Sequence, residues 1–420
     1  MQPIIMHIDM NSYFASCEQQ DNPAWRGKPL GVCEHLGGII IAPSVEAKQW
    51  GIKTAMPVWE ARKLYPKIIL TPTHAERYRF YTRRFLAVLA DYTSQVEPYS
   101  IDEAFLDISQ VSCIRIPSQQ GLIAVDPFIE AERIATEIKA RIKKEVGDWL
   151  RCSVGIASNK LLAKIASDSQ KPDGLVTVRP EQVLGWYTRL ALTDIPGIAS
   201  RQAKTLMSLG IRTLQDLKNY PVQSLIARFG VMGVHLHNIG QLTGSFKSRV
   251  SYDSTIKSMG HVYTLPKEVR ERASLEPVLF RLCEMVATRL RTKSLVATGC
   301  SVHIHRAQDG VCIAKSGKFK ERVSDGRELF GYAMNVLRLL SVDEIVHFPC
   351  KRIGITAWGL QPYTEQLALF PKREARRHSL LLGLDRLRIK YGTEIIQRVV
   401  SFQAQGYIRD SVGFGRMKEL

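Results

Sequence analysis

Length, composition and charge narrow the function of this chain before any motif is considered. The chain has 420 residues, more than one hydrophobic core accommodates, so we expect two to four domains. It carries 58 Lys and Arg against 40 Asp and Glu, and this net charge of +18 indicates a polyanionic partner. No segment has the length and apolarity of a membrane span and the N-terminus lacks a signal peptide, so we expect no membrane partner and a cytoplasmic location.

The distribution of charge and cysteine adds to this picture. Residues 1–110 hold 11 basic and 12 acidic side chains, whereas residues 241–420 hold 30 basic and 17 acidic ones, so the positive charge lies mostly in the C-terminal part. A basic surface kept only for solubility remains the alternative. The eight cysteines are scattered without C-x-x-C pairs, which indicates reduced thiols rather than disulfides or a zinc site.

Two segments far apart in the chain place carboxylates among apolar, strand-forming residues. In the first, Asp9 ends the apolar run that begins at Ile4; in the second, Asp102 and Glu103 lie side by side between apolar flanks. An acidic pair in apolar surroundings is costly unless a cation neutralises it. Taken alone, the pair could be a solvated hairpin turn, but three carboxylates on two core strands predict a two-metal site.

Polar and aromatic residues follow the first acidic strand. Asn11 or Ser12 can cap a helix that begins near Tyr13, and the backbone N–H groups at its start would lie beside the metal site, where a triphosphate can bind. For the rings of Tyr13 and Phe14, core packing is the simpler interpretation. Lys48 in the next helix is either a phosphate contact or a solvated side chain, and the sequence favours the second.

The order of elements around these strands predicts the fold. Helices over 74–96 and 128–145 and a strand over 152–156 complete a strand–helix–strand–strand–helix–strand order, which is typical of a ferredoxin-like sheet. A capped helix over 157–166 follows. Lys160 in its first turn opposes the helix dipole, which is unfavourable unless an anion binds there.

A turn in the middle of the chain suggests a helix-hairpin-helix. Pro196 and Gly197 are flanked by apolar residues and feed a helix that carries Lys204. Such a turn offers backbone N–H groups, here including that of Ile198, to a DNA phosphate. Asp194 is the sole candidate for a catalytic acid beside it and more plausibly caps a turn.

Residues 250–361 repeat a strand–helix–strand–strand–helix–strand alternation. The expected helices lie near 275–293 and 326–340, and the expected strands lie near 257–264, 299–305, 311–319 and 352–358. Basic residues, Lys257, Lys315 and Lys318 among them, fall mainly in strands and loops. This placement suits a sheet laid against a DNA backbone, with solvated charges as the alternative.

The C-terminal tail contains a short apolar segment. Gln366, Leu367, Leu369 and Phe370 follow the end of a domain and are expected to dock into a groove of another protein, or else to be an ordinary packing segment. Residues 373–399 continue as a basic helical stretch that can pack back on the body.

Three motifs together resemble the Y-family translesion DNA polymerases. They are the runs from Asp9 to Ala15, from Tyr99 to Ala104 and from Asn159 to Gly174, and the resemblance covers about residues 1–361 in family order. It implies an α+β multidomain fold. The implied domains are a palm with fingers at 1–166 (fingers about 11–74), a thumb at 167–240, a little finger at 241–361 and a tail at 362–420.

The resemblance also implies the catalytic residues. Asp9, Asp102 and Glu103 would hold two Mg²⁺ ions, and Met10 would offer a backbone carbonyl. The implied reaction is transfer of a nucleotide from a dNTP to a primer 3′-hydroxyl on a DNA template. Asn11 stands where many members have a second Asp.

The nucleotide contacts follow from the same resemblance. Tyr13, Lys48 and Lys160 would bind the substrate, and Phe14 matches the steric gate that rejects a ribonucleotide 2′-hydroxyl. Val45 and Lys48 stand where the family usually has Tyr and Arg, and Lys is a point charge rather than a bidentate fork.

The implied partners are primer-template DNA, a dNTP and a sliding clamp, the last bound through Gln366–Phe370, and we expect a monomer. Two other functions stay open from the sequence. One is a catalytically silent adaptor bound to the clamp in a mutagenesis complex. The other is a helix-hairpin-helix nuclease or glycosylase.

Overall fold

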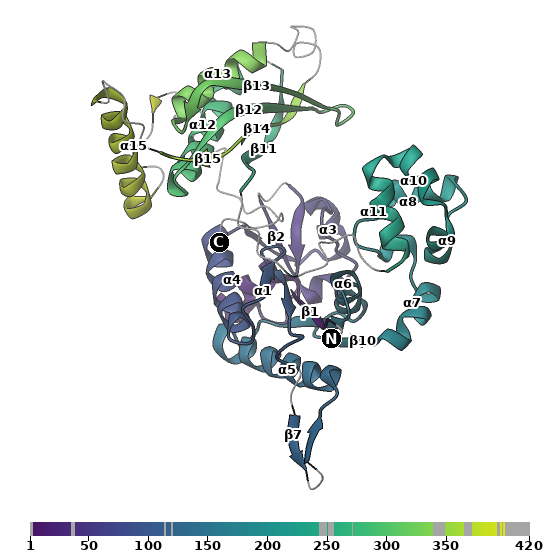
Figure 1. Ribbon diagram of the computed structural model, residues 1–420. Helices are drawn as coiled ribbons and strands as arrows, with labels where there is room; N and C mark the ends of the chain where they lie inside the picture. The colour runs from purple at the N-terminus through teal and green to yellow at the C-terminus, as the bar shows by residue number, and fades with distance from the viewer. Residues whose placement is uncertain are drawn as a thin grey trace. The chain divides into compact units, whose positions relative to one another are not determined.

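The computed structural model describes residues 3–34, 38–112, 115–118, 121–242, 250, 256–270, 272–338, 349–364, 372–392, 395, 396, 398 and 399. These residues fall into two compact units that divide between residues 250 and 256 (Figure 1). We call the N-terminal part unit 1 and the C-terminal part unit 2. The predicted tail segment Gln366–Phe370 lies outside the described residues.

A five-stranded sheet forms the centre of unit 1. Its strands are β1 (Ile5–Met10), β5 (Val96–Pro98), β6 (Glu103–Asp107), β9 (Cys152–Ala157) and β10 (Leu175–Val178). The order is β10-β9-β1-β6-β5, and β1 pairs antiparallel with both β6 and β9. This confirms the predicted ferredoxin-like order, to which β10 is added as an edge strand parallel to β9.

Helices cover both faces of this sheet because side chains alternate along β1. Met6 and Ile8 share a core with α4 (Ala75–Ala90) and α5 (Pro127–Arg141), whereas Ile5 packs with α6 (Lys160–Ser169) on the opposite face. The last helix lies very close to β9. A Cβ atom added at Gly155 would lie 2.0 Å from the carbonyl oxygen of Ala163, so only glycine permits this approach.

Smaller elements complete unit 1. The remaining strands form a sheet of order β3-β2-β4 and a hairpin that projects beyond α5 (Figure 1). They are β2 (Leu30–Cys33), β3 (Ile40–Pro43), β4 (Ile69–Pro72), β7 (Arg115–Ser118) and β8 (Gly121–Ala124). The remaining helices are α1 (Tyr13–Asp21), α2 (Val45–Gln49), α3 (Val58–Leu64), α7 (Val183–Arg189), α8 (Ser200–Ser208), α9 (Leu214–Asn219), α10 (Val222–Phe229) and α11 (Val231–Gly240).

Unit 2 has the predicted alternation of strands and helices. Its elements are β11 (Ser258–Val269), α12 (Arg272–Thr292), β12 (Leu295–Arg306), β13 (Cys312–Val323), α13 (Gly326–Arg338), β14 (Cys350–Trp358), β15 (Gln361–Pro362) and α15 (Lys372–Tyr391). The antiparallel sheet has the order β11-β14-β12-β13, and its apolar core is shared with α12 and α13. None of the helices in the described ranges combines the length and apolarity that a membrane crossing requires.

Candidate active site

The three predicted carboxylates lie on adjacent central strands of unit 1. Asp9, near the end of β1, is directly opposite Glu103, the first residue of β6. The backbone N–H of Met10 donates to the carbonyl oxygen of Asp102 over 2.8 Å, which fixes the turn before β6 against the end of β1. Strand register, rather than sequence proximity, therefore brings the two acidic segments together.

A cavity of about 480 Å³ opens at the end of β1 and the start of α1. Asp9 and Asp102 line it together with Lys48 and Lys171, so two carboxylates and two ammonium groups face one space. The other lining residues are Met10, Asn11, Ser12, Tyr13, Phe14, Ile41, Ala42, Pro43, Val45, Gln49, Thr54 and Pro172. Glu103 is not among them.

Lysines from α6 and the turn after it neutralise the acids. The Nζ of Lys171 lies 2.8 Å from Oδ1 of Asp9 and 2.8 Å from Oδ1 of Asp168. Burial alone would lower the pKa of Lys171, but these two carboxylates outweigh it and raise that pKa. On the face of the sheet that α6 covers, Glu103 forms an ion pair with Lys164 and a hydrogen bond of 3.0 Å with the buried ring of His7.

The two adjacent acids have opposite pKa shifts. Burial, with the negative charges of Asp9 and Glu103, raises the pKa of Asp102 to about 6, although a hydrogen bond from Ser100 works against it. Burial also acts to raise the pKa of Glu103, but the hydrogen bond from His7 and the charge of Lys164 lower it to about 2. Asp102 is thus the carboxylate whose negative charge is least compensated.

These residues fit a hard divalent cation. Carboxylate oxygens and a backbone carbonyl are the ligands that Mg²⁺ prefers, and Asp9, Asp102 and Met10 border one cavity. As the side chains stand in the described ranges, no three His, Cys, Asp or Glu residues are grouped to hold a metal ion, and Glu103 pairs with Lys164. The ammonium of Lys171 provides the counter-charge at Asp9.

The start of α1 differs from the expected cap. Ser12 is the N-cap residue, but its backbone is left-handed (φ 46°) and its hydroxyl makes no capping bond. That buried hydroxyl of Ser12, which belongs to a residue bordering the cavity, has no hydrogen-bond partner among the described residues. Asn11 does not cap either, since its side chain bonds Ser153 at 3.0 Å and the backbone N–H of Asp173 at 2.7 Å. Its role is to tie β1 to β9 and to the turn before β10.

Tyr13 and Phe14 fit both interpretations that the sequence offered, core packing and contact with a substrate. Tyr13 and Phe14 are buried, yet both line the cavity. The ring of Phe14 stacks on that of Tyr78 in α4, with centroids 4.3 Å apart. The hydroxyl of Tyr13 donates to the backbone carbonyl of Tyr78 over 2.8 Å. Core packing therefore fixes the rings at the wall of the cavity.

The structure brings Lys171, rather than Lys160, to the cavity. Lys160 is 3% exposed, pairs with Glu97 and is not among the lining residues. Lys160 begins α6 and Lys171 lies two residues beyond its end, and the ten residues of the helix span about 15 Å. Lys160 in the first turn of α6 was expected to need an anion beside it because of the helix dipole. That anion is the carboxylate of Glu97. The sequence does not single out Lys171, although it lies just before Pro172 in the third motif.

Lys48 borders the cavity with part of its side chain, while the residue as a whole remains exposed, as the sequence favoured. Partial burial, together with the positive charge of Lys171, lowers the pKa of Lys48. Two ammonium groups that repel one another in one cavity favour a polyanionic ligand such as a triphosphate. Val45 borders the same cavity.

The predicted DNA-binding turn of unit 1 has the backbone that such a turn needs. Gly197 has φ +98°, which favours glycine. The N–H of Ile198, which was expected to face a phosphate, instead donates to the carbonyl of Ile195 over 3.0 Å within the turn. Ile198 is buried, Pro196 is partly buried and Lys204 is exposed on α8. The turn feeds α8 as expected, and its contact with DNA stays a prediction.

In unit 2 the predicted lysines do not share one face. A Cβ on Gly317 would meet a side chain of α13, and the ring of Phe319 packs on a tyrosine of α13, so these residues face the helices. Lys318, between them, points to the open face of the sheet, whereas Lys315 shares the helix-facing side, where it remains exposed. Lys257 is exposed just before β11.

Comparison with known proteins identifies the family. Residues 8–168 match the impB/mucB/samB family, and residues 256–369 match the C-terminal domain of that family. The DNA polymerase IV of Pelotomaculum thermopropionicum is 35% identical over 98% of both chains, and the DNA polymerase IV 1 of Bacillus subtilis is 32% identical over 94% of this chain and 92% of its own length. A solved chimera of the Y-family polymerases Dbh and Dpo4 superimposes with a TM-score of 0.74 at 27% identity, covering 86% of this chain and 99% of the chimera.

The chain therefore belongs to the impB/mucB/samB family, and its fold is that of the Y-family DNA polymerases. Within that family it is a polymerase of the DNA polymerase IV type. The predicted resemblance and the α+β multidomain fold are thereby confirmed.

Proposed function

We propose that this chain is a template-directed DNA polymerase of low fidelity that performs translesion synthesis, by transferring a nucleotide from a dNTP to the 3′-hydroxyl of a primer paired with template DNA. One observation carries the proposal in a chain of this family: β1 and β6 place Asp9 and Asp102 in a cavity that also holds Lys48 and Lys171. A catalytically silent adaptor is not favoured, because it has no use for an acidic cluster that is costly to keep.

Nucleotidyl transfer in this family depends on divalent metal, and we assign the metal to the residues at the end of β1. Asp9, Asp102, Glu103 and the carbonyl of Met10 would hold two Mg²⁺ ions. When bound there, Mg²⁺ would supply a lower pKa for the primer 3′-hydroxyl and positive charge for the leaving pyrophosphate. In this scheme Lys164 and His7 orient Glu103, whose pKa near 2 keeps it ionised.

The dNTP binds on the other side of the same cavity. Lys171 exchanges Asp9 for a phosphate oxygen, and Lys48 supplies a second positive charge to the triphosphate. The backbone N–H groups at the start of α1 and the unpartnered hydroxyl of Ser12 add donors to the phosphates. Phe14, fixed by its stack on Tyr78, acts as the steric gate for the sugar.

The remaining contacts are assigned to primer-template DNA and to one protein partner. Pro196, Gly197, Ile198 and Lys204 bind the DNA backbone from unit 1. Lys257 and Lys318 do so from unit 2, Lys318 from the open face of the sheet, whereas the predicted contact of Lys315, on the side of the helices, is not retained. We assign Gln366, Leu367, Leu369 and Phe370 to a sliding clamp and expect the polymerase to be a monomer.

Primer extension tests the carboxylate assignment on undamaged and abasic templates with Mg²⁺. Asp102→Asn and Glu103→Gln should each lower the rate of nucleotide addition on the order of 1,000-fold, because several kcal/mol of charge stabilisation is lost. Asp91→Asn removes an exposed carboxylate that pairs with Arg141 and should leave the rate unchanged. If the wild-type protein binds primed DNA yet adds no nucleotide, even with a sliding clamp, the adaptor function replaces this proposal.

A further inference from the structure

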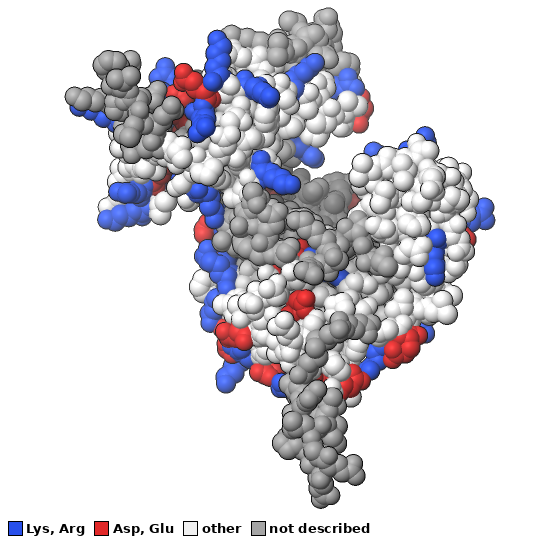
Figure 2. All heavy atoms as spheres, in the orientation of Figure 1, with Lys and Arg blue, Asp and Glu red and all other residues white. Residues whose placement is uncertain are grey.

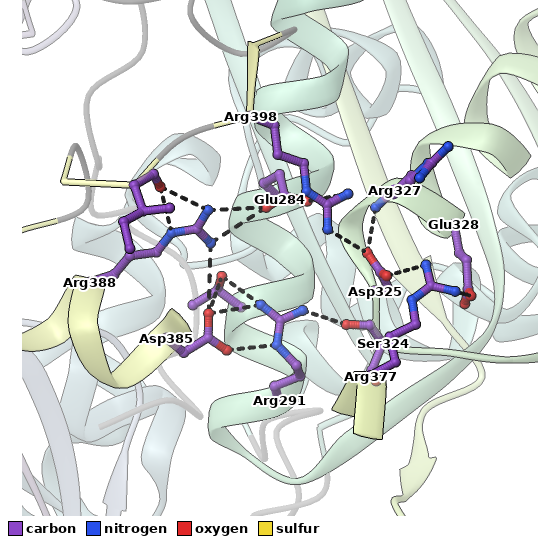
Figure 3. A network of polar contacts seen from close by, with 12 residues as sticks. Glu284, Arg291, Ser324, Asp325, Arg327, Glu328, Arg377, Asp385, Arg388 and Arg398 are labelled. Carbon is purple, nitrogen blue, oxygen red and sulfur yellow. Dashed lines mark hydrogen bonds and ion pairs between the residues drawn. The ribbon is translucent and has the colours of Figure 1, made fainter. Parts of the chain in front are cut away.

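The C-terminal helix of unit 2 is attached through charged side chains (Figure 3). At the centre, Asp385 of α15 accepts two hydrogen bonds from Arg291 of α12, at 2.6 Å from Nε and 2.9 Å from Nη2. Both residues are almost fully buried. Arg291 also donates to the backbone carbonyl of Ser324 over 2.6 Å, which links the pair to the turn before α13.

Three further arginines of the C-terminal segment surround this pair (Figure 3). Arg377 forms ion pairs with Asp325 and Glu328 at the start of α13. Arg388 lies 3.5 Å from Glu284 of α12. Arg398 lies 3.8 Å from Glu284 and 3.5 Å from Asp325. We call Arg377, Arg388 and Arg398 the latch arginines, because together they hold the segment to a set of three carboxylates of unit 2. These carboxylates are those of Glu284, Asp325 and Glu328.

Apolar packing supplies part of this attachment, since Leu384 is half-buried and the ring of His378 stacks on that of Tyr363, with centroids 4.0 Å apart. The apolar core of unit 2, as far as the described residues define it, contains no residue of α15. Leu381 is buried, but Leu380 is 63% exposed and Ile389 is 76% exposed. The buried Arg291–Asp385 pair is little screened by salt, whereas Arg377 and Arg398 are partly exposed, so salt or competing charges weaken their ion pairs more readily.

A nucleic-acid backbone is the competitor that the chemistry favours. Arginine binds phosphate in the same bidentate geometry in which it binds carboxylate. The outer side of α15 also exposes Arg376, Arg386 and Lys390, which gives a polyanion a first contact with the docked helix. We propose that α15 is an ionic latch and that DNA opens it by taking the latch arginines from Glu284, Asp325 and Glu328.

The proposal adds a cryptic DNA-binding surface to the chain. In the closed latch the carboxylates neutralise the latch arginines, so these do not contribute to DNA affinity. In the open latch the arginines pair with phosphates instead. Because opening has a cost, a protein whose latch is already open should bind DNA more tightly than the wild type.

Binding of a blunt DNA duplex, measured without Mg²⁺ or dNTP, tests the latch independently of polymerase activity. Asp385→Asn leaves Arg291 without its ionic partner and should open the latch, so trypsin should cleave faster after the arginines of α15. We expect this variant to bind the duplex about 10-fold more tightly at low salt. Glu268→Gln, an exposed site in β11 with the same charge change, is the matched control and should bind with near wild-type affinity.

Two further variants complete the test. Adding Arg377→Gln and Arg388→Gln to Asp385→Asn should abolish the gain, because the groups that bind phosphate are removed. If Asp385→Asn does not fold, Glu328→Gln loosens the exposed end of the network and should tighten binding in the same direction by a smaller factor. The proposal is wrong if trypsin reports an open latch while duplex affinity equals that of Glu268→Gln, or if the added glutamines leave the gain intact.

Discussion

At the scale of single residues, the positions of Lys171 and Lys160 lead to opposite expectations. Lys171→Met should raise KM for the dNTP about 10- to 100-fold, because one charge-assisted hydrogen bond contributes about 1.5–3 kcal/mol. Lys160→Met should leave KM near its wild-type value and lower the melting temperature, since Glu97 would lose its buried partner. Single-nucleotide kinetics and thermal unfolding of both variants check this. A KM effect confined to Lys160→Met would contradict the placement of the triphosphate.

The same comparison shows which residues of the site the sequence could predict. Asp9, Asp102 and Glu103 could be predicted because charged residues are rare inside apolar strands. Pairing of the two strands then places them together. The residues that pair with each of these charges could not be predicted. His7 pairs with Glu103 from the same strand as Asp9, and whether Lys160 or Lys171 reaches the cavity depends on how α6 lies across the sheet. That placement is set by packing over long sequence separations.

At the scale of elements, α6 positions the site and Gly155 positions α6. Gly155→Ala should destabilise unit 1 by about 1–3 kcal/mol, because the new methyl group would overlap the backbone of α6 at Ala163. Polymerase activity should fall as well, since the displaced helix carries Lys164 and precedes Lys171. Thermal unfolding and primer extension measure both effects.

A matched glycine serves as the control for that substitution. Gly185 lies in α7, and no atom would lie within 4 Å of an added Cβ. Gly185→Ala should therefore raise stability by about 0.5–1 kcal/mol through the higher helix propensity of alanine. If the two variants had equal stability, the close approach of α6 to β9 would not be what requires glycine at position 155.

The elements themselves were largely predictable, whereas their ends were less so. Strand order and the α+β class follow from hydrophobic periodicity and from the alternation of strands and helices. The helix expected over 74–96 ends at Ala90, and the helix expected over 128–145 changes to a π-helical turn after Arg141. Asn11 or Ser12 was expected to cap α1, but neither side chain does, and Ser12 adopts a left-handed backbone at the cavity instead. These differences arise where tertiary contacts outweigh local propensity.

At the scale of the whole molecule, charge is the property that recruits DNA. The net charge of +18 predicts that DNA affinity falls steeply with salt, because each lysine bound to a phosphate releases counterions. Figure 2 shows Lys and Arg side chains distributed over the visible face of unit 2, without one continuous patch. We expect the contribution of each of these side chains to DNA affinity to depend on the face of the sheet from which it projects.

Lys318 and Lys315 separate these contributions because they project from opposite faces of β13. If primer-template DNA lies against the open face of the sheet, Lys318→Gln should reduce the slope of log affinity against log salt concentration by about 0.9. Lys315→Gln makes the same change of charge on the same strand, and its slope should stay close to the wild-type slope because its side chain is on the side of the helices. Titrations of labelled primer-template DNA at several salt concentrations give all three slopes. Equal reductions in the two variants would mean that total charge, rather than one face of the sheet, determines how unit 2 binds DNA.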